Sequence, residues 1–176
     1  MTEKIIIAGS GGQGIMLLGK ILATAAMKEN KFVTWLPSYG AEVRGGTAHC
    51  TVIISDKEIG SPYIDKADAL IIMNKPSLEK FNNRLKNKGC LIVNSSLAGG
   101  VQNKNSRIFA YPFTEMAIKL GNIKVANMVA LGALVAKRGV VYLRSIHEVI
   151  EEIAPQTKKD LITINKIALE EGAKLK

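Results

Sequence analysis

The residues most suggestive of chemistry form a glycine-rich hexapeptide near the start of the sequence. It reads Gly9-Ser10-Gly11-Gly12-Gln13-Gly14 and fits the pattern Gly-x-Gly-x-x-Gly between a short apolar run and a helical pattern. Glycines let a backbone turn sharply and approach a ligand without a Cβ clash. The free N–H groups at the start of the next helix would then face an anion. The hexapeptide predicts a phosphate or pyrophosphate site, and tight strand–helix packing is the alternative purpose of its glycines.

A dinucleotide site makes a further demand that this sequence does not meet. Such a site needs an acidic residue at the end of the second strand to hold the ribose. Here the second apolar run ends Trp35-Leu36-Pro37-Ser38, and Glu29 stands before it. No arginine occupies that strand end to receive a 2′-phosphate. The pattern therefore favours a phosphate ligand other than NAD or NADP, with a free-standing NAD(P)-binding oxidoreductase kept as an alternative.

A second unusual segment follows directly and carries two charged residues among glycines. It reads Ser38-Tyr39-Gly40-Ala41-Glu42-Val43-Arg44-Gly45-Gly46. Because it follows the carboxyl end of a predicted strand, it lies where open α/β sheets place ligands. An ordinary surface turn with a local ion pair between Glu42 and Arg44 would explain the charges alone. The order of residues is more elaborate than such a turn needs.

Apolar patterning predicts the elements that must position these two loops. Strands are expected at 4–8, 32–36 (stopped by Pro37), 47–55, 69–73, 90–93 and 107–110. Helices are expected at 13–28, 76–88, 114–120 running on through 125–138, 145–153 and 158–171. The first strand, helix and second strand form a βαβ unit for which a right-handed crossover is expected. The sequence predicts one α/β domain, 1–176: a three-layer, Rossmann-like α/β/α domain with a mostly parallel sheet.

Two helices show their buried faces in the spacing of their apolar residues. The stripe expected on the first helix is Ile15, Leu18, Leu22, Ala25 and Ala26. The stripe expected on the last helix is Leu161, Ile164, Ala168 and Leu175.

Composition narrows the class of protein. Of the 176 residues, 47% are hydrophobic and only 5% aromatic, so the core must consist of Ile, Val, Leu and Ala. The longest apolar run, 125–136, is too short to cross a membrane. With no signal pattern at Met1, a cytoplasmic protein without a membrane partner is expected. The net charge of +9 comes from scattered lysines without aromatic interleaving, which indicates a solvated surface rather than nucleic-acid binding.

Few side chains have the neighbours that catalysis or metal binding needs. Cys50 and Cys90 show no Cys-x-x-Cys spacing and are expected to be reduced, strand-associated apolar residues. Two thiols cannot hold an iron–sulfur cluster alone. Ser10 has no His–Asp partners, and no paired carboxylates or zinc ligands stand out, so we assign no catalytic and no metal residue.

Two strand-end segments and one asparagine are further candidates. Met73-Asn74-Lys75-Pro76 and Asn94-Ser95-Ser96 stand at the ends of predicted strands, on the ligand-bearing edge, and Ser95 or Ser96 could simply be turn residues. Asn127 stands in an apolar helix, where it could reach the cleft, although a satisfied interior hydrogen bond is more common.

The two loops in this order resemble those of a known family. Gly9-x-Gly11-Gly12-Gln13-Gly14-Ile15, the segment from Tyr39 to Gly46, then Val52-Ile53-Ile54-Ser55 and Ser61-Pro62 resemble the gamma subunits of 2-oxoacid:ferredoxin oxidoreductases. The second loop looks more like the 2-oxoglutarate type than the pyruvate type, which tends to carry Phe-Gly-x-Glu-Arg-Arg-Gly-Ala. Indolepyruvate-type small subunits share the first loop but are less similar at the second.

The resemblance implies a subunit without redox chemistry of its own. Members of the family oxidatively decarboxylate a 2-oxoacid with thiamine diphosphate, transfer the acyl group to coenzyme A and pass two electrons to ferredoxin. Thiamine diphosphate, magnesium and iron–sulfur clusters are expected in the alpha, beta and cluster-bearing delta subunits. The isolated chain is expected to be inactive, and whether it forms a homodimer stays open.

The resemblance also implies a partial coenzyme A site in this chain. By position, its residues are Gly9, Ser10, Gly11, Gly12, Gln13 and Gly14, with Pro37, Ser38, Tyr39, Glu42 and Arg44 bordering the same cleft. Where related domains place lysines after the second strand, this chain has Leu36-Pro37-Ser38, and Arg44 is the nearest cation that could substitute. A purely structural role of the glycine loop, packing against a neighbouring subunit, is the remaining alternative.

Overall fold

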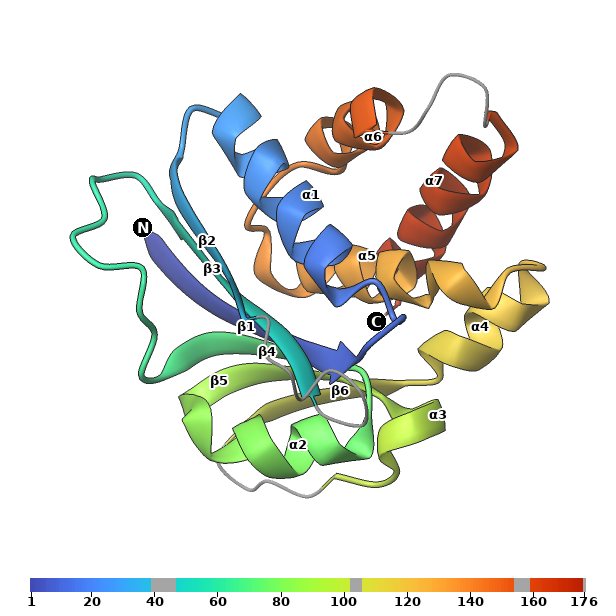
Figure 1. Cartoon of the computed structure of the whole chain (residues 1–176), viewed down its shortest axis with the longest axis horizontal. Coiled ribbons are helices and arrows are strands. Elements are labelled where there is room, and N and C mark those ends of the chain that lie inside the picture. Colours follow the sequence, from blue (N-terminus) through green and yellow to red (C-terminus); the bar gives the residue numbers. More distant parts are fainter. Residues whose placement is uncertain (39–46, 102–105, 154–158, 176) are drawn as a thin grey trace.

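The fold is built on one six-stranded sheet. The structure is a computed structural model that describes residues 1–38, 47–101, 106–153 and 159–175 (Figure 1). The strand order is β2-β3-β1-β4-β5-β6. The bounds are β1 Thr2–Ser10, β2 Phe32–Ser38, β3 Thr47–Ser55, β4 Ala67–Ile72, β5 Leu85–Asn94 and β6 Arg107–Tyr111. Only β3 runs against its neighbours, so the expectation of a mostly parallel sheet is confirmed, in a mixed sheet.

The antiparallel strand brings the carboxyl ends of β1 and β2 together at one end of the sheet. β3 lies between β1 and β2, so the first strand–helix–strand unit has another strand inserted into it. In the register, Ser10 of β1 lies opposite Thr47 of β3, and Ser38 of β2 lies opposite His49. The carboxyl ends of β1 and β2 therefore meet at the amino end of β3.

Helices cover both faces of the sheet, as the three-layer prediction requires (Figure 1). The α-helices are α1 Ile15–Lys28, α2 Lys75–Phe81, α3 Ser95–Ala98, α4 Phe113–Lys119, α5 Ala126–Arg138, α6 Leu143–Ile153 and α7 Lys159–Ala173. Alternate residues of β1 serve the two layers. Ile5 and Ile7 belong to the larger apolar cluster with α1 and α5, whereas Ile6 and Ala8 belong to the smaller cluster beside α2. The predicted stripe of α1 is buried throughout.

Four predicted boundaries are wrong, each for a physical reason. β2 continues through Pro37 because it is an edge strand, where a missing N–H costs no ladder bond. The helix expected at 76–88 ends at Phe81, and Leu85 instead opens β5, where its side chain is buried. The helix expected to run on to 138 breaks at Gly121, whose φ is +89°. The first helix begins at Ile15 because Gly14 is left-handed.

The carboxyl-terminal helix packs against α5 through two glycines. A Cβ placed on Gly132 would collide with the carbonyl of Leu169, and one on Gly172 with the carbonyl of Val129. The buried residues of α7 are Ala168, Leu169 and Gly172, whereas Leu161, predicted to be buried, is 37% exposed. The two helices therefore approach backbone to backbone.

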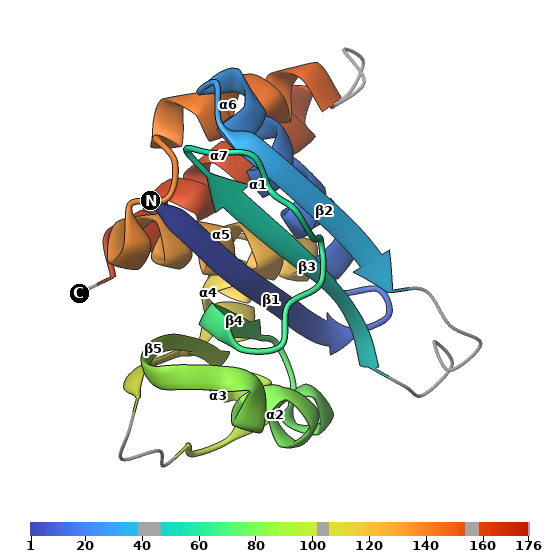
Figure 2. The same ribbon diagram turned by 90° about the vertical axis from the view of Figure 1, so that its left-hand side faces the viewer.

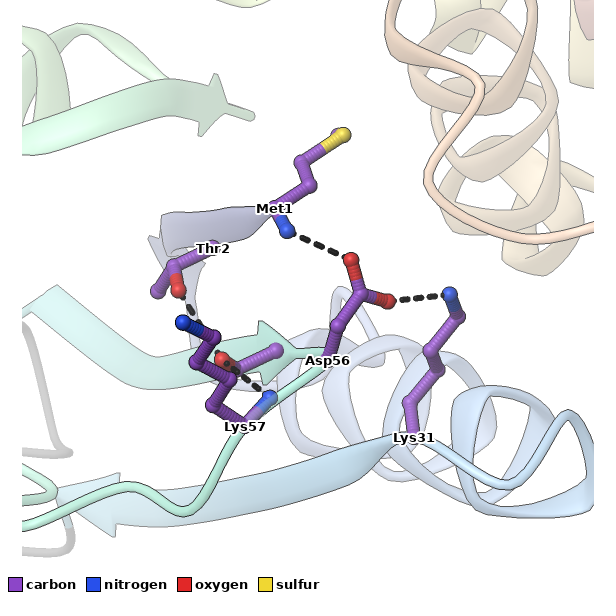
Figure 3. A network of polar contacts seen from close by, with 6 residues as sticks. Met1, Thr2, Lys31, Asp56 and Lys57 are labelled. Carbon is purple, nitrogen blue, oxygen red and sulfur yellow. Dashed lines mark hydrogen bonds and ion pairs between the residues drawn. The ribbon is translucent and has the colours of Figure 1, made fainter.

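A polar network lies at the amino end of β1, at the opposite end of the strand from the glycine loop (Figure 3). The Asp56 carboxylate lies 2.5 Å from the Met1 amino group and 2.5 Å from Nζ of Lys31. Beside it, the Thr2 and Ser55 hydroxyls are 2.9 Å apart. The hydrogen bond from Lys31 is the main cause that lowers the pKa of Asp56 to about 2. In the described part of the chain, none of the helices is both long and apolar enough to cross a membrane.

Candidate functional site

The glycine loop turns the chain from β1 into α1 through two left-handed glycines. Gly12 has φ +85° and Gly14 has φ +70°, a conformation that other residues adopt only with strain. Gly14 is the N-cap of α1, and no side chain caps the helix there. The first intrahelical bond joins the Leu18 N–H to the Gly14 carbonyl over 2.9 Å. The N–H groups of the first turn before Leu18 have no acceptor inside the helix, as at every helix start.

Gln13 folds back onto the protein and braces the loop from within. Its Oε1 accepts a bond from the Ser10 N–H at 2.7 Å, and its Nε2 donates to the Met73 carbonyl at 3.3 Å. The side chain passes so close to Gly9 that a Cβ there would lie 2.6 Å from Oε1. Gln13 and Gly9 therefore shape the loop, while the exposed Gly11 and Gly12 form its outer turn.

Three buried asparagines from distant elements fix the loop and its supports. Asn74, which follows β4, donates to the Ser10 hydroxyl at 2.5 Å. Asn94, at the end of β5, donates to the Met73 carbonyl at 3.3 Å. Asn127, in the first turn of α5, donates to the Gly14 carbonyl at 3.2 Å. The interior hydrogen bond expected of Asn127 is present, and its partner is the loop itself.

A cleft of about 360 Å³ opens between the loop, α1 and the strand ends. Its polar side consists of Ser10, Gly11, Gly12, Gly14 and Ser38. Its apolar side consists of Ile15, Met16, Leu17 and Ala48. The structure thus brings Ser38 to the glycine loop, as predicted, whereas Pro37, predicted at the same cleft, is not among its described lining residues. The other predicted loop residues, Tyr39, Glu42 and Arg44, lie outside the described residues.

A smaller cleft of about 160 Å³ lies on the other side of the loop, and a lysine is among its lining residues. Gly12, Gln13, Thr114 and Lys124 line it, together with apolar residues. Sequence reasoning did not select Lys124, because nothing in its neighbourhood indicates that α4 and α5 return it to a loop more than a hundred positions earlier.

The two cysteines are apolar core residues, as predicted. Cys50 in β3 and Cys90 in β5 are both buried, and neither forms a disulfide. Burial is the main cause that raises the pKa of Cys50 to about 12 and that of Cys90 to about 11. Among the residues that the structure describes, no three His, Cys, Asp or Glu side chains are grouped to hold a metal ion.

Comparison with known proteins identifies the family to which this chain belongs. The family model described as pyruvate ferredoxin/flavodoxin oxidoreductase matches residues 4–175. The ketoisovalerate oxidoreductase subunit VorA of Methanothermobacter marburgensis is 36% identical over 97% of this chain. This chain spans only 36% of that relative's length and 35% of its counterpart's in Methanothermobacter thermautotrophicus. The 2-oxoglutarate synthase subunit KorC of M. marburgensis is 37% identical over 88% of each chain.

Solved structures are similar over almost the whole chain. The gamma subunit of a keto/oxoacid ferredoxin oxidoreductase from Geobacter sulfurreducens superposes with a TM-score of 0.84 and 32% identity, covering 97% of this chain and 95% of that one. The 2-oxoglutarate:ferredoxin oxidoreductase from Magnetococcus marinus, with 2-oxoglutarate, coenzyme A and succinyl-CoA bound, has a TM-score of 0.90 at 22% identity. The match covers 99% of this chain and 31% of that one, and at this identity it shows the shared fold.

Proposed function

Because the chain belongs to the pyruvate ferredoxin/flavodoxin oxidoreductase family, we propose that it is the gamma subunit of a 2-oxoacid:ferredoxin oxidoreductase and holds part of the coenzyme A site. Residues 1–176 are taken as one gamma-type domain. The whole enzyme would convert a 2-oxoacid and coenzyme A to acyl-coenzyme A and CO₂, with two electrons passing to ferredoxin. In this proposal the alpha, beta and cluster-bearing delta subunits carry thiamine diphosphate, magnesium and the iron–sulfur clusters.

The observation that carries the coenzyme A proposal is the uncapped start of α1 behind two left-handed glycines. N–H groups at such a position, together with the helix dipole, favour a phosphate. The adjoining cleft continues along Met16 and Leu17, which supply an apolar wall. Coenzyme A joins phosphates to less polar groups, so its chemistry fits a cleft that is polar at the loop and apolar along α1. A cleft of about 360 Å³ is small for the whole cofactor, so the rest would contact other subunits.

Within the family, we propose 2-oxoglutarate as the first substrate to test. The supporting observation is that the KorC relative matches this chain over 88% of both lengths, whereas the VorA relatives extend far beyond it. Ketoisovalerate and pyruvate are the rival substrates, since relatives carry those names as well. The substrate pocket is expected mostly in other subunits, so an assay of the complex must decide.

Purification of the native assembly tests the proposal as a whole. An affinity tag on the carboxyl end of this chain in its own cells should recover larger subunits that contain thiamine diphosphate and iron–sulfur clusters. The recovered complex should reduce ferredoxin with coenzyme A and 2-oxoglutarate faster than with pyruvate or ketoisovalerate. Recovery of the chain alone, under conditions that preserve iron–sulfur proteins, would exclude the subunit role.

A matched pair of glycine variants tests the coenzyme A site within that complex. Gly12 has φ +85° and Gly121 has φ +89°, and neither has an atom within 4 Å of an added Cβ. Gly12→Val and Gly121→Val therefore carry similar backbone strain, but only the first places a side chain in the loop. We expect Gly12→Val alone to raise the KM for coenzyme A. Equal KM values in both variants would favour the purely structural role.

Calorimetry separates this proposal from the NAD(P) alternative. Titration of the complex with NADH and with coenzyme A should give heat of binding for coenzyme A only. Tight NADH binding that Gly12→Val abolishes would instead identify the loop as a dinucleotide site.

A further inference from the structure

A further cavity lies on the face of the sheet opposite α1, away from the glycine cleft. Residues 56–66 cross this face beside β3 and partly cover the edge formed by β2 and β3 (Figure 2). Beneath them is a cavity of about 280 Å³, with Ser38, His49, Thr51, Tyr63, Ile64 and Arg84 in its lining. Among the described residues, Ser38 alone lines both this cavity and the glycine cleft, so the two are separate spaces.

The wall of this cavity contains a buried hydroxyl that lacks a hydrogen-bond partner. Thr51 is 8% exposed, and its Oγ1 has no partner among the described residues. Buried polar groups in native proteins almost always bond to protein, ordered water or a ligand. Thr51 projects from the same face of β3 as His49, because the two are two positions apart in a strand. The hydroxyl and the imidazole of His49 therefore lie on the face of β3 that lines the cavity, and the hydroxyl is buried just behind its surface.

Two cationic side chains, Arg84 and Lys80, act on the imidazole of His49 beside the cavity. The guanidinium of Arg84 donates to the backbone carbonyls of Ile64 and Asp65, the latter at 3.2 Å. A guanidinium has five N–H donors, so Arg84 retains donors for a ligand. Lys80 lies close by, with Nζ 3.1 Å from the Thr47 hydroxyl. No Asp or Glu is among the lining residues that the structure describes.

His49 is placed to report on a charge in this cavity. Its ring packs against Phe81 with centroids 4.8 Å apart. Burial, followed by the charges of Lys80 and Arg84, lowers the pKa of His49, while a backbone hydrogen bond at Thr47 opposes the shift. A negative charge placed beside the imidazole would raise its pKa.

We propose that this cavity is a second ligand site, which binds a small carboxylate or phosphate through Thr51 and Arg84. A carboxylate or phosphate oxygen accepts hydrogen bonds from both the hydroxyl and the guanidinium. The volume suits a small metabolite rather than a nucleotide or coenzyme. This inference is independent of the proposed function, because it uses other residues and another face of the sheet.

Imidazole NMR of the isolated full chain tests the site, because the sequence contains only two histidines. The pKa values of His49 and His147 are measured in sodium chloride and then with phosphate, acetate or 2-oxoglutarate at the same ionic strength. We expect a saturable rise in the pKa of His49 alone. The anion that acts at the lowest concentration identifies phosphate or carboxylate as the ligand chemistry. If none of the three moves His49, or if both histidines move in parallel, the proposal is overturned.

The variant Thr51→Val tests the role of the hydroxyl without changing the shape of the side chain. Since the hydroxyl has no partner among the described residues, the ligand-free variant should have an unchanged or higher Tm. Its affinity for the active anion should fall about tenfold, the effect of losing one hydrogen bond to a charged group. Thr163→Val on the exposed surface of α7 is the control and should retain wild-type affinity. A lower Tm for Thr51→Val without anion, or an unchanged affinity, would refute the assignment of Thr51.

Discussion

The side chain of Asn127 holds the backbone carbonyl of Gly14 at 3.2 Å, across 113 positions of sequence. Gly14 is the left-handed residue from which α1 begins, and Asn127 is 3% exposed. The start of the anion-facing helix is therefore fixed by an element from the other half of the chain.

Replacing Asn127 should weaken both the fold and the ligand site. Asn127→Ala leaves the Gly14 carbonyl without its partner, which should lower the free energy of unfolding by about 1–3 kcal/mol. In the assembled complex, the KM for coenzyme A should rise because the loop amides are less well positioned. Asn165→Ala is the control, because Asn165 makes a similar amide-to-carbonyl bond on exposed α7 and should change the free energy of unfolding by only about 0.5 kcal/mol. Urea denaturation of both variants gives the comparison, and equal losses would contradict the special role of Asn127.

Two left-handed glycines that end or begin helices should respond differently to the same change. Gly139 has φ +58° and open space where a Cβ would be added, so Gly139→Ala should cost only the backbone strain of about 1–2 kcal/mol. Gly14→Ala adds a collision with Nδ2 of Asn127 and should cost more. The double variant Gly14→Ala with Asn127→Ala should lose less free energy of unfolding than the sum of the single losses. Additive losses would show that the two residues do not interact.

The cysteines should be chemically inert while the protein is folded. Burial raises the pKa of Cys50 to about 12 and that of Cys90 to about 11, so almost no thiolate exists at mildly alkaline pH. Ellman's reagent should detect neither thiol in the native chain and both after unfolding in urea. Rapid modification of the native protein would mean that β3 or β5 opens readily.

Protonation of Asp56 should occur at unusually low pH. The group's pKa is about 2 in the fold against an ordinary value of 3.8, chiefly because of the hydrogen bond from Lys31. A lowered folded pKa means that the contribution to stability is present above about 3.8 and is lost as the pH falls towards 2. Carboxyl-carbon NMR should give the low pKa, and Lys31→Met should raise it towards 3.8. An unchanged pKa in Lys31→Met would assign the shift to another cause.

The sequence predicted correctly those elements whose apolar pattern is local and does not depend on which strands lie beside them. The stripe of α1 and the bounds of β3, 47–55, are correct because periodicity alone determines which side is buried. The prediction at Pro37 was wrong because an edge position cannot be recognised before the strand order is known. Leu85 was assigned to a helix because its pairing with Ala67 of β4 depends on a distant strand.

The candidate site divides in the same way. The glycine loop was recognisable because its six residues are contiguous, whereas its supports come from separate places in the chain. Asn127 was noticed singly, and Asn74 and Asn94 only as members of strand-end segments. Their common attachment to the loop and to Met73 depends on the order in which strands meet. Thr51 and Arg84 gave no signal at all, since a cavity has no sequence pattern.

The glycine contact between α5 and α7 bears on how variants of this protein should be interpreted. Helix α5 touches Gly172 of α7 through the carbonyl of Val129, and its first turn carries the asparagine that positions Gly14. A bulkier residue at Gly172 would displace α5 and so disturb a loop near the opposite terminus. Reduced ligand affinity after mutation near the carboxyl end is therefore no proof that the mutated residue touches the ligand.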